Sequence, residues 1–170
     1  QYDPVEGPNA RMWVDWMNSR NYVVHHGQAV PVTYAWNSAS NEAVRDGLVS
    51  LQDTLLVDWL LGEEAALEDG TLNAAERTAL TAFLNSGRAL LISGSYLAWD
   101  LDGMGQAPAF MRETLRAGYV VSDAGTSTVQ PVAGGAFAGL GILAFEAPDA
   151  YVVDAPDVLV PLNGATVTLS

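Results

Sequence analysis

Polar residues that could do chemistry follow two apolar segments of this chain. Glu63 and Glu64 come just after residues 55–61, and Ser95 comes just after residues 89–93. A helical pattern separates the two segments, and strands joined through a helix run parallel. Parallel α/β sheets bind ligands at the carboxyl ends of their strands. The sequence therefore predicts the place of a site, without indicating what the site does.

Four carboxylates belong to this predicted site, because Asp100 and Asp102 follow soon after Ser95. Carboxylates held together can serve acid–base chemistry or bind a hard cation such as Ca²⁺, and Asp100 and Asp102 are the candidate metal ligands. Adjacent residues of an extended segment point in opposite directions, so only Glu63 or Glu64 would face a given ligand. A structural role is the alternative, in which Arg20 pairs with Glu63 or Asp100 and fixes the loops.

Ser95 and Glu63 are the candidate catalytic residues. A nucleophilic serine needs an exposed turn, a base and oxyanion donors. The turn at Ser95 lacks the second glycine of a nucleophile elbow, and its base would have to be His25 or His26. The alternative is that Ser95 caps the helix that follows it, which the sequence favours.

Trp99 lies beside Asp100 and could stack on a sugar, although packing or a protein interface is the favoured role of its indole. Ligand-binding candidates are thus drawn from strand ends and from one upstream helix. They are Arg20, Glu63, Glu64, Ser95, Trp99 and Asp100.

Composition excludes several functions. Twenty acidic residues face seven basic ones, all arginine, and the net charge is −13, which argues against nucleic-acid binding. No apolar run approaches the ~20 residues of a membrane-spanning helix, so we expect no membrane insertion. The chain has no cysteine, which excludes disulfides and thiolate chemistry. No phosphate loop or dinucleotide motif is present, and we predict no cofactor.

Periodicity and turn signals predict a single α/β domain over residues 1–170, with a core in 1–122 and a β-rich portion in 123–170. Asn73 and Glu76 have the spacing of a capping box at the start of a helix, and Gly87 is placed to end it. Nearly continuous apolar residues in 55–61 and 89–93 predict strands buried on both faces. Other predicted helices are 19–30 and 108–117, and residues 40–51 are predicted to form a short helix with its connection. Other predicted strands are 32–36, 119–121, 129–132, 141–146, 151–153, 158–160 and 165–169.

Four runs carry a family resemblance: NSRNYVVHHGQAV, WNSASNEAV, VDWLLGEE and AERTALTAFLNSGRALLISGSYLAWDLD. They resemble an α/β domain of large secreted bacterial proteins, sometimes found beside golvesin-like or xanthan-lyase-labelled modules. That domain is similar in outline to class I glutamine amidotransferases, whose fold is a flavodoxin-like three-layer sandwich. The amidotransferase cysteine is missing here, so the resemblance implies no such activity. The family's first strand is missing too, and we expect a fragment or module of a larger protein.

We therefore expect a flavodoxin-like three-layer sandwich with a mainly parallel sheet whose first strand is absent from this chain. The predicted function is a non-catalytic binding or assembly module of a secreted or cell-surface bacterial protein. Its expected partners are other segments or chains that complete the sheet, because an unpaired edge invites strand pairing. A hydrolase using Ser95 and the strand-end carboxylates, and a carbohydrate-binding domain, are the alternatives.

Overall fold

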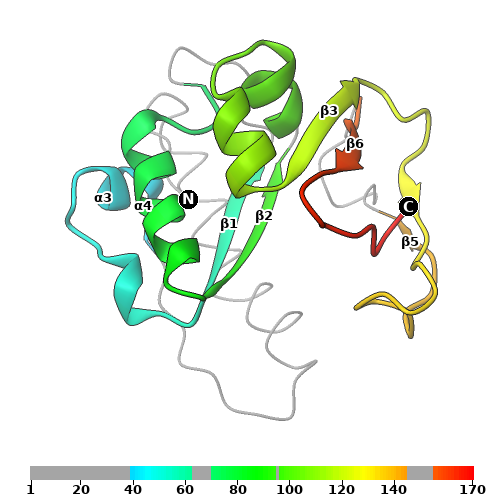
Figure 1. The fold of residues 1–170 in the computed structure, drawn as a ribbon, viewed down its shortest axis with the longest axis horizontal. Coiled ribbons are helices and arrows are strands. Elements are labelled where there is room, and N and C mark those ends of the chain that lie inside the picture. Colours follow the sequence, from blue (N-terminus) through cyan, green and yellow to red (C-terminus); the bar gives the residue numbers. More distant parts are fainter. Residues whose placement is uncertain (1–38, 63–69, 95, 145–154) are drawn as a thin grey trace. The chain divides into compact units, whose positions relative to one another are not determined.

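The computed structural model describes residues 39–62, 70–94, 96–144 and 155–170 (Figure 1). The helix predicted over 19–30 and the strand over 32–36 lie outside these residues. Along the chain, the described elements are α3 (Asn41–Arg45), η2 (Leu51–Asp53), β1 (Leu56–Gly62), α4 (Ala74–Asn85), β2 (Ala89–Gly94), η3 (Trp99–Gly103), η4 (Phe110–Thr114), β3 (Ala117–Val121), β4 (Thr128–Val129), β5 (Leu143–Ala144) and β6 (Val158–Pro161).

Two compact units can be distinguished in the chain. The first comprises Gln1–Val57 and Thr78–Ala89, and the second comprises Asp58–Arg77 and Leu90–Ser170. Three elements, β1, α4 and β2, have residues in both units. The hydrogen bonds that Asp100, Asp102 and Asp157 accept from described residues lie within the second unit.

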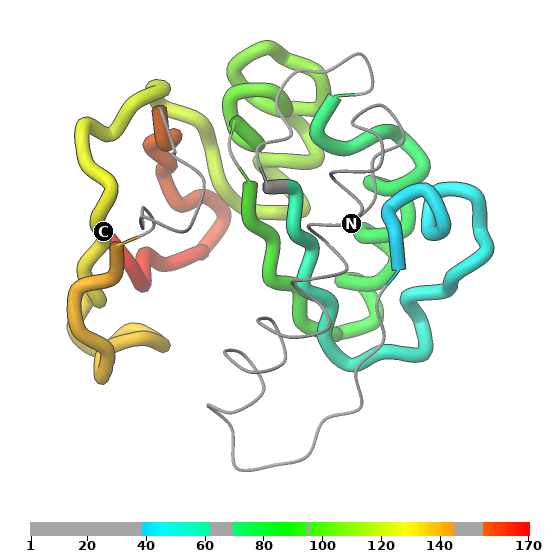
Figure 2. Tube along the Cα trace, turned by 180° about the vertical axis from the view of Figure 1, so that it is seen from behind, coloured from blue at the N-terminus to red at the C-terminus, as the bar shows by residue number. Residues whose placement is uncertain are grey.

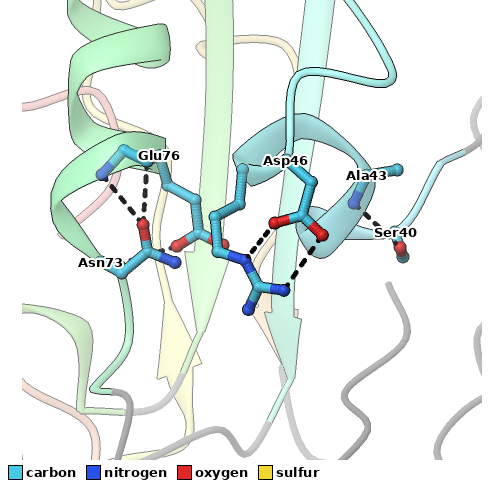
Figure 3. A network of polar contacts seen from close by, with 7 residues as sticks. Ser40, Ala43, Asp46, Asn73 and Glu76 are labelled. Carbon is cyan, nitrogen blue, oxygen red and sulfur yellow. Dashed lines mark hydrogen bonds and ion pairs between the residues drawn. The ribbon is translucent and has the colours of Figure 1, made fainter.

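The start of α4 is fixed by the predicted capping box, which is confirmed. Asn73 Oδ1 accepts hydrogen bonds from the backbone N–H groups of Ala75 and Glu76, and Glu76 Oε2 accepts one from the N–H of Asn73 at 2.9 Å. Figure 3 shows Asn73 and Glu76 facing one another at this helix start. Gly87, with φ +80°, follows the helix in the left-handed conformation that favours glycine.

Strands β1 and β2 form a parallel pair, as predicted, and lie side by side in Figures 1 and 2. At their starts, the N–H of Ala89 donates to the carbonyl of Leu55. At their ends, a Cβ placed on Gly94 would lie 2.5 Å from the Cβ of Leu61, so only glycine fits there. The prediction that β2 is covered on both faces is wrong, since its residues alternate between exposed and half-buried and Leu91 is 47% exposed.

The remaining strands pair antiparallel, as β3 with β6 and β4 with β5. The prediction of a flavodoxin-like three-layer sandwich with a mainly parallel sheet is therefore wrong for the described residues, which form three separate two-stranded sheets and few helices. The cause lies at β3. Its residues take their partner from the far end of the sequence, with Gly118 opposite Val160, instead of extending the parallel pair. The expectation that a first strand is absent depended on that sandwich fold, so it no longer follows.

The helix predicted over 108–117 stops earlier than expected, at Thr114. Arg116 has a φ of +58°, a left-handed conformation that no α-helix continues through, and β3 begins at the next residue. Among the described residues, no helix is long and apolar enough to span a membrane.

Candidate functional site

Asp100 lies on the short helical segment after β2 and is buried, with 4% of its surface exposed. Its Oδ2 accepts two hydrogen bonds from Thr71, one from the backbone N–H at 2.9 Å and one from the hydroxyl at 2.7 Å. A buried carboxylate is costly unless such donors satisfy it. Asp100 therefore fixes the turn in front of α4, where Gly70 approaches the same oxygen closely.

Asp102 is also buried, but it contacts different partners. Its Oδ2 accepts a hydrogen bond of 2.8 Å from the backbone N–H of Tyr119 in β3. Its Oδ1 lies 2.7 Å from Arg112 Nε and forms an ion pair that lacks hydrogen-bond alignment. The Asp102 side chain is 2% exposed, whereas that of Arg112 is 58% exposed. Asp102 thus ties η3 to both η4 and β3.

A third carboxylate, Asp157, was not among the residues selected from the sequence. Its Oδ2 accepts a 2.9 Å hydrogen bond from the backbone N–H of Trp99, and its Oδ1 is buried without a hydrogen-bond partner. Burial raises the pKa of Asp157, while the backbone N–H groups of Trp99 and Ala98 lower it to a smaller extent. Its partner lies 58 residues away along the chain, and no local pattern could have identified the pair.

Trp99 is half-buried, and its ring meets that of Tyr96 edge to face at a centroid distance of 6.0 Å. A Cβ on Gly103 would lie 3.1 Å from the Tyr119 ring and 3.3 Å from Trp99 Cδ1. The indole therefore packs partly within the protein. Its remaining exposed surface is compatible with a sugar or a protein partner.

The described structure does not bring the predicted carboxylates to a common point. Asp100 accepts hydrogen bonds from Thr71, whereas Asp102 accepts one from Tyr119 and forms an ion pair with Arg112. Within the described ranges, no group of three or more acidic or histidine side chains could hold a metal ion. The other candidates lie outside the described residues, namely Arg20, His25, His26, Glu63, Glu64 and Ser95.

Exposed aliphatic side chains occur in several described segments, and some of them lie on the pair of strands β3 and β6, which we call the β3–β6 ribbon. Four of them have between 41% and 55% of their surface exposed: Val120, Val121, Leu159 and Val160. Exposed apolar surface on a strand pair marks an interaction site more often than chance exposure of single residues does. The short strand pattern was predicted here, but its exposure was not.

From β3 onward the sequence carries charge of one sign, although Arg116 directly precedes β3. Residues 117–170 contain five acidic residues and no lysine, arginine or histidine. An acidic segment of this length offers no cation of its own to balance its charge, so it favours partners that carry positive charge.

Comparisons with protein-family models, curated proteins and solved structures found no match to this chain. The resemblance to a domain of large secreted bacterial proteins therefore stays a prediction from sequence motifs.

Proposed function

We propose that this chain is a non-catalytic binding or assembly module that contacts a protein partner through the β3–β6 ribbon. The observation that carries the proposal is the exposure of the four aliphatic side chains on that ribbon. Exposed apolar surface costs free energy in water, at about 25 cal/mol for each Å², and a partner that covers these side chains regains that energy. A secreted or cell-surface location remains a prediction from the sequence.

The roles of the buried acids also support a binding module over an enzyme. A general acid or base must reach a proton on the substrate. Asp100 and Asp102 instead accept hydrogen bonds from backbone N–H groups of neighbouring segments, with 4% and 9% of their surfaces exposed. These carboxylates hold the helical segment in place, and the ribbon supplies the surface.

Carbohydrate binding is a second candidate, favoured by the half-buried Tyr96–Trp99 ring pair. Aromatic faces beside polar groups are common sugar platforms. The indole N–H and the exposed ring surface would then contact the sugar. A Trp99→Ala variant should lose any sugar bound on a glycan array, whereas ribbon variants should retain it.

Selection of binding peptides from a displayed random library tests the main proposal. Peptides enriched on the wild-type chain should bind a Val120→Thr/Leu159→Thr double variant at least about tenfold more weakly. Threonine is favourable in a β-strand, so both changes should preserve the strands while they make the ribbon more polar. Leu48→Thr is the matched control, since Leu48 is 80% exposed and lies off the ribbon.

The outcomes separate clearly. Ribbon-dependent peptides that bind the Leu48→Thr control normally support the proposal. Enriched peptides that bind the double variant as well as the wild type contradict it, and so does a selection that enriches no peptide. Far-ultraviolet circular dichroism of each variant establishes that the loss of binding is not a loss of fold.

A further inference from the structure

The two outer edges of the β3–β6 ribbon differ in their hydrogen bonding. The N–H of Leu162 donates to the carbonyl of Arg116, which places an inter-strand bonded pair at these two residues. Bonded and non-bonded pairs alternate along an antiparallel ladder. Gly118 and Val160 are therefore the next bonded pair, and the two pairs beside them, Ala117 with Pro161 and Tyr119 with Leu159, direct their backbone groups outward.

The outer edge of β3 is closed at Tyr119. Its outward N–H donates to the buried carboxylate of Asp102 at 2.8 Å, so it cannot receive a further strand. A Cβ on Gly118 would lie 3.8 Å from the same carboxylate, which shows how closely the helical segment approaches this strand. Blocking an edge in this way protects it from unwanted pairing.

The outer edge of β6 is open in the described structure. The sheet that contains β6 has only β3 as its other strand, and no hydrogen bond joins the outward N–H or carbonyl of Leu159 to another described group. Pro161 has no N–H and adds only its carbonyl to this edge. Leu159 is 49% exposed and Val160 41% exposed, so the edge carries apolar side chains next to backbone groups that have no partner among the described residues.

Two kinds of strand could pair with this edge, one from a second copy of the chain and one from another protein, and charge favours the second. A second copy would bring another net charge of −13 and another base-free segment 117–170 to the same place, and like charges brought together oppose association. A segment that carries lysine or arginine on either side of its apolar residues would instead be attracted.

We infer that the free edge of β6 receives an extended segment of a partner protein, with alternating aliphatic side chains and flanking basic residues, as an added β-strand. Backbone hydrogen bonds to Leu159 and the carbonyl of Pro161 set its position, and its aliphatic side chains cover Leu159 and Val160. The inference rests on the proposed binding function and names the kind of partner and the edge that it uses.

A synthetic peptide of alternating valine and threonine with paired lysines at both ends is the probe, measured by calorimetry with the whole chain. An added strand bonds through one of its own edges only, and alternate residues direct their N–H groups to opposite edges. N-methylation of either all valines or all threonines should therefore weaken binding at least about tenfold, while methylation of the other set is tolerated. Replacing the lysines by glutamates should abolish binding at low salt.

Protein variants give an independent test. Leu159→Pro removes the outward N–H without removing a bond to β3 and should weaken binding about tenfold, whereas Leu159→Ala keeps the N–H and serves as its control. If Leu159→Pro does not fold, the methylated peptides still decide the matter on the unmodified chain.

Equal binding by both methylated peptides overturns strand addition, and equal binding by the glutamate peptide overturns the basic partner. No binding of the lysine peptide up to about 1 mM also overturns the inference. In each case, ribbon-dependent peptides from the library would leave the proposed binding function standing, so the two failures are distinguishable.

Discussion

The helical segment 96–115 and the strands that follow it differ in what they bury. The helical segment contains six buried residues: Ala98, Asp100, Leu101, Asp102, Phe110 and Met111. Among the described residues after Gly118, none is buried. Burial of side chains is the main source of folding free energy. The comparison indicates that the helical segment stabilises the second unit, while the described residues from Tyr119 onward mainly provide surface.

The largest test of this comparison removes one apolar side chain from each region. Leu101 is fully buried, and Leu101→Ala should lower the free energy of unfolding by about 2–5 kcal/mol through lost burial and the cavity that remains. Ile142 is 66% exposed, and Ile142→Ala should change it by less than about 0.5 kcal/mol. Urea denaturation followed by circular dichroism measures both. Similar losses for the two variants would mean that the strand region also holds a core.

A second test concerns the contact that joins the two regions. Asp102→Ala should cost about 2–3 kcal/mol, because it leaves the Tyr119 N–H without an acceptor and removes the ion pair. Arg112→Gln should cost under about 1 kcal/mol, because the Arg112 side chain is 58% exposed and solvent screens its charge. If the arginine variant loses as much as the aspartate variant, the ion pair and not the backbone hydrogen bond joins the regions.

A third test uses the contact between the parallel strands. Gly94→Ala would place a methyl group 2.5 Å from the Leu61 Cβ, and the strands would have to shift apart. The expected cost is about 1–3 kcal/mol, as for other overpacked sites. Gly139→Ala is the control, because a Cβ there meets no atom within 4 Å. A neutral Gly94→Ala variant would show that β1 and β2 are not held at this separation.

Local signals explain what could be predicted from the sequence. The capping box of Asn73 and Glu76 involves residues three apart, so its hydrogen bonds follow from spacing alone. The parallel pair of β1 and β2 follows from the strand–helix–strand pattern in the same way. Three of the residues chosen for the predicted site, Trp99, Asp100 and Asp102, lie on one described helical segment.

Long-range contacts explain what could not be predicted. The pairing of Gly118 with Val160 joins strands that are distant in sequence, and the apolar pattern of β3 suits a parallel or an antiparallel neighbour equally. The partners of Asp100 and Asp102 are likewise set by tertiary structure, so their residue types suggested ligand binding where the structure has hydrogen bonds to the backbone. Asp157 had no local signal because its acceptor role depends on Trp99.

The smallest expected effect is a dependence on pH at Asp157, the carboxylate that connects the start of β6 to the helical segment. Burial raises its pKa above the usual 3.8, so the folded state favours the protonated form. The stability that Asp157 contributes is then complete below about pH 3.8 and is lost as the pH rises through the raised pKa. Asp157→Asn keeps an acceptor for the Trp99 N–H without the charge. Its stability relative to the wild type should be higher at about pH 7 than at about pH 3, measured by urea denaturation at each pH.

Asp157→Ala separates charge from hydrogen bonding, because it removes the acceptor as well and should be less stable than Asp157→Asn at both pH values. A relative stability of Asp157→Asn that falls as the pH rises would mean that ionised Asp157 stabilises the connection, and that the C-terminal strands are held to the helical segment by charge.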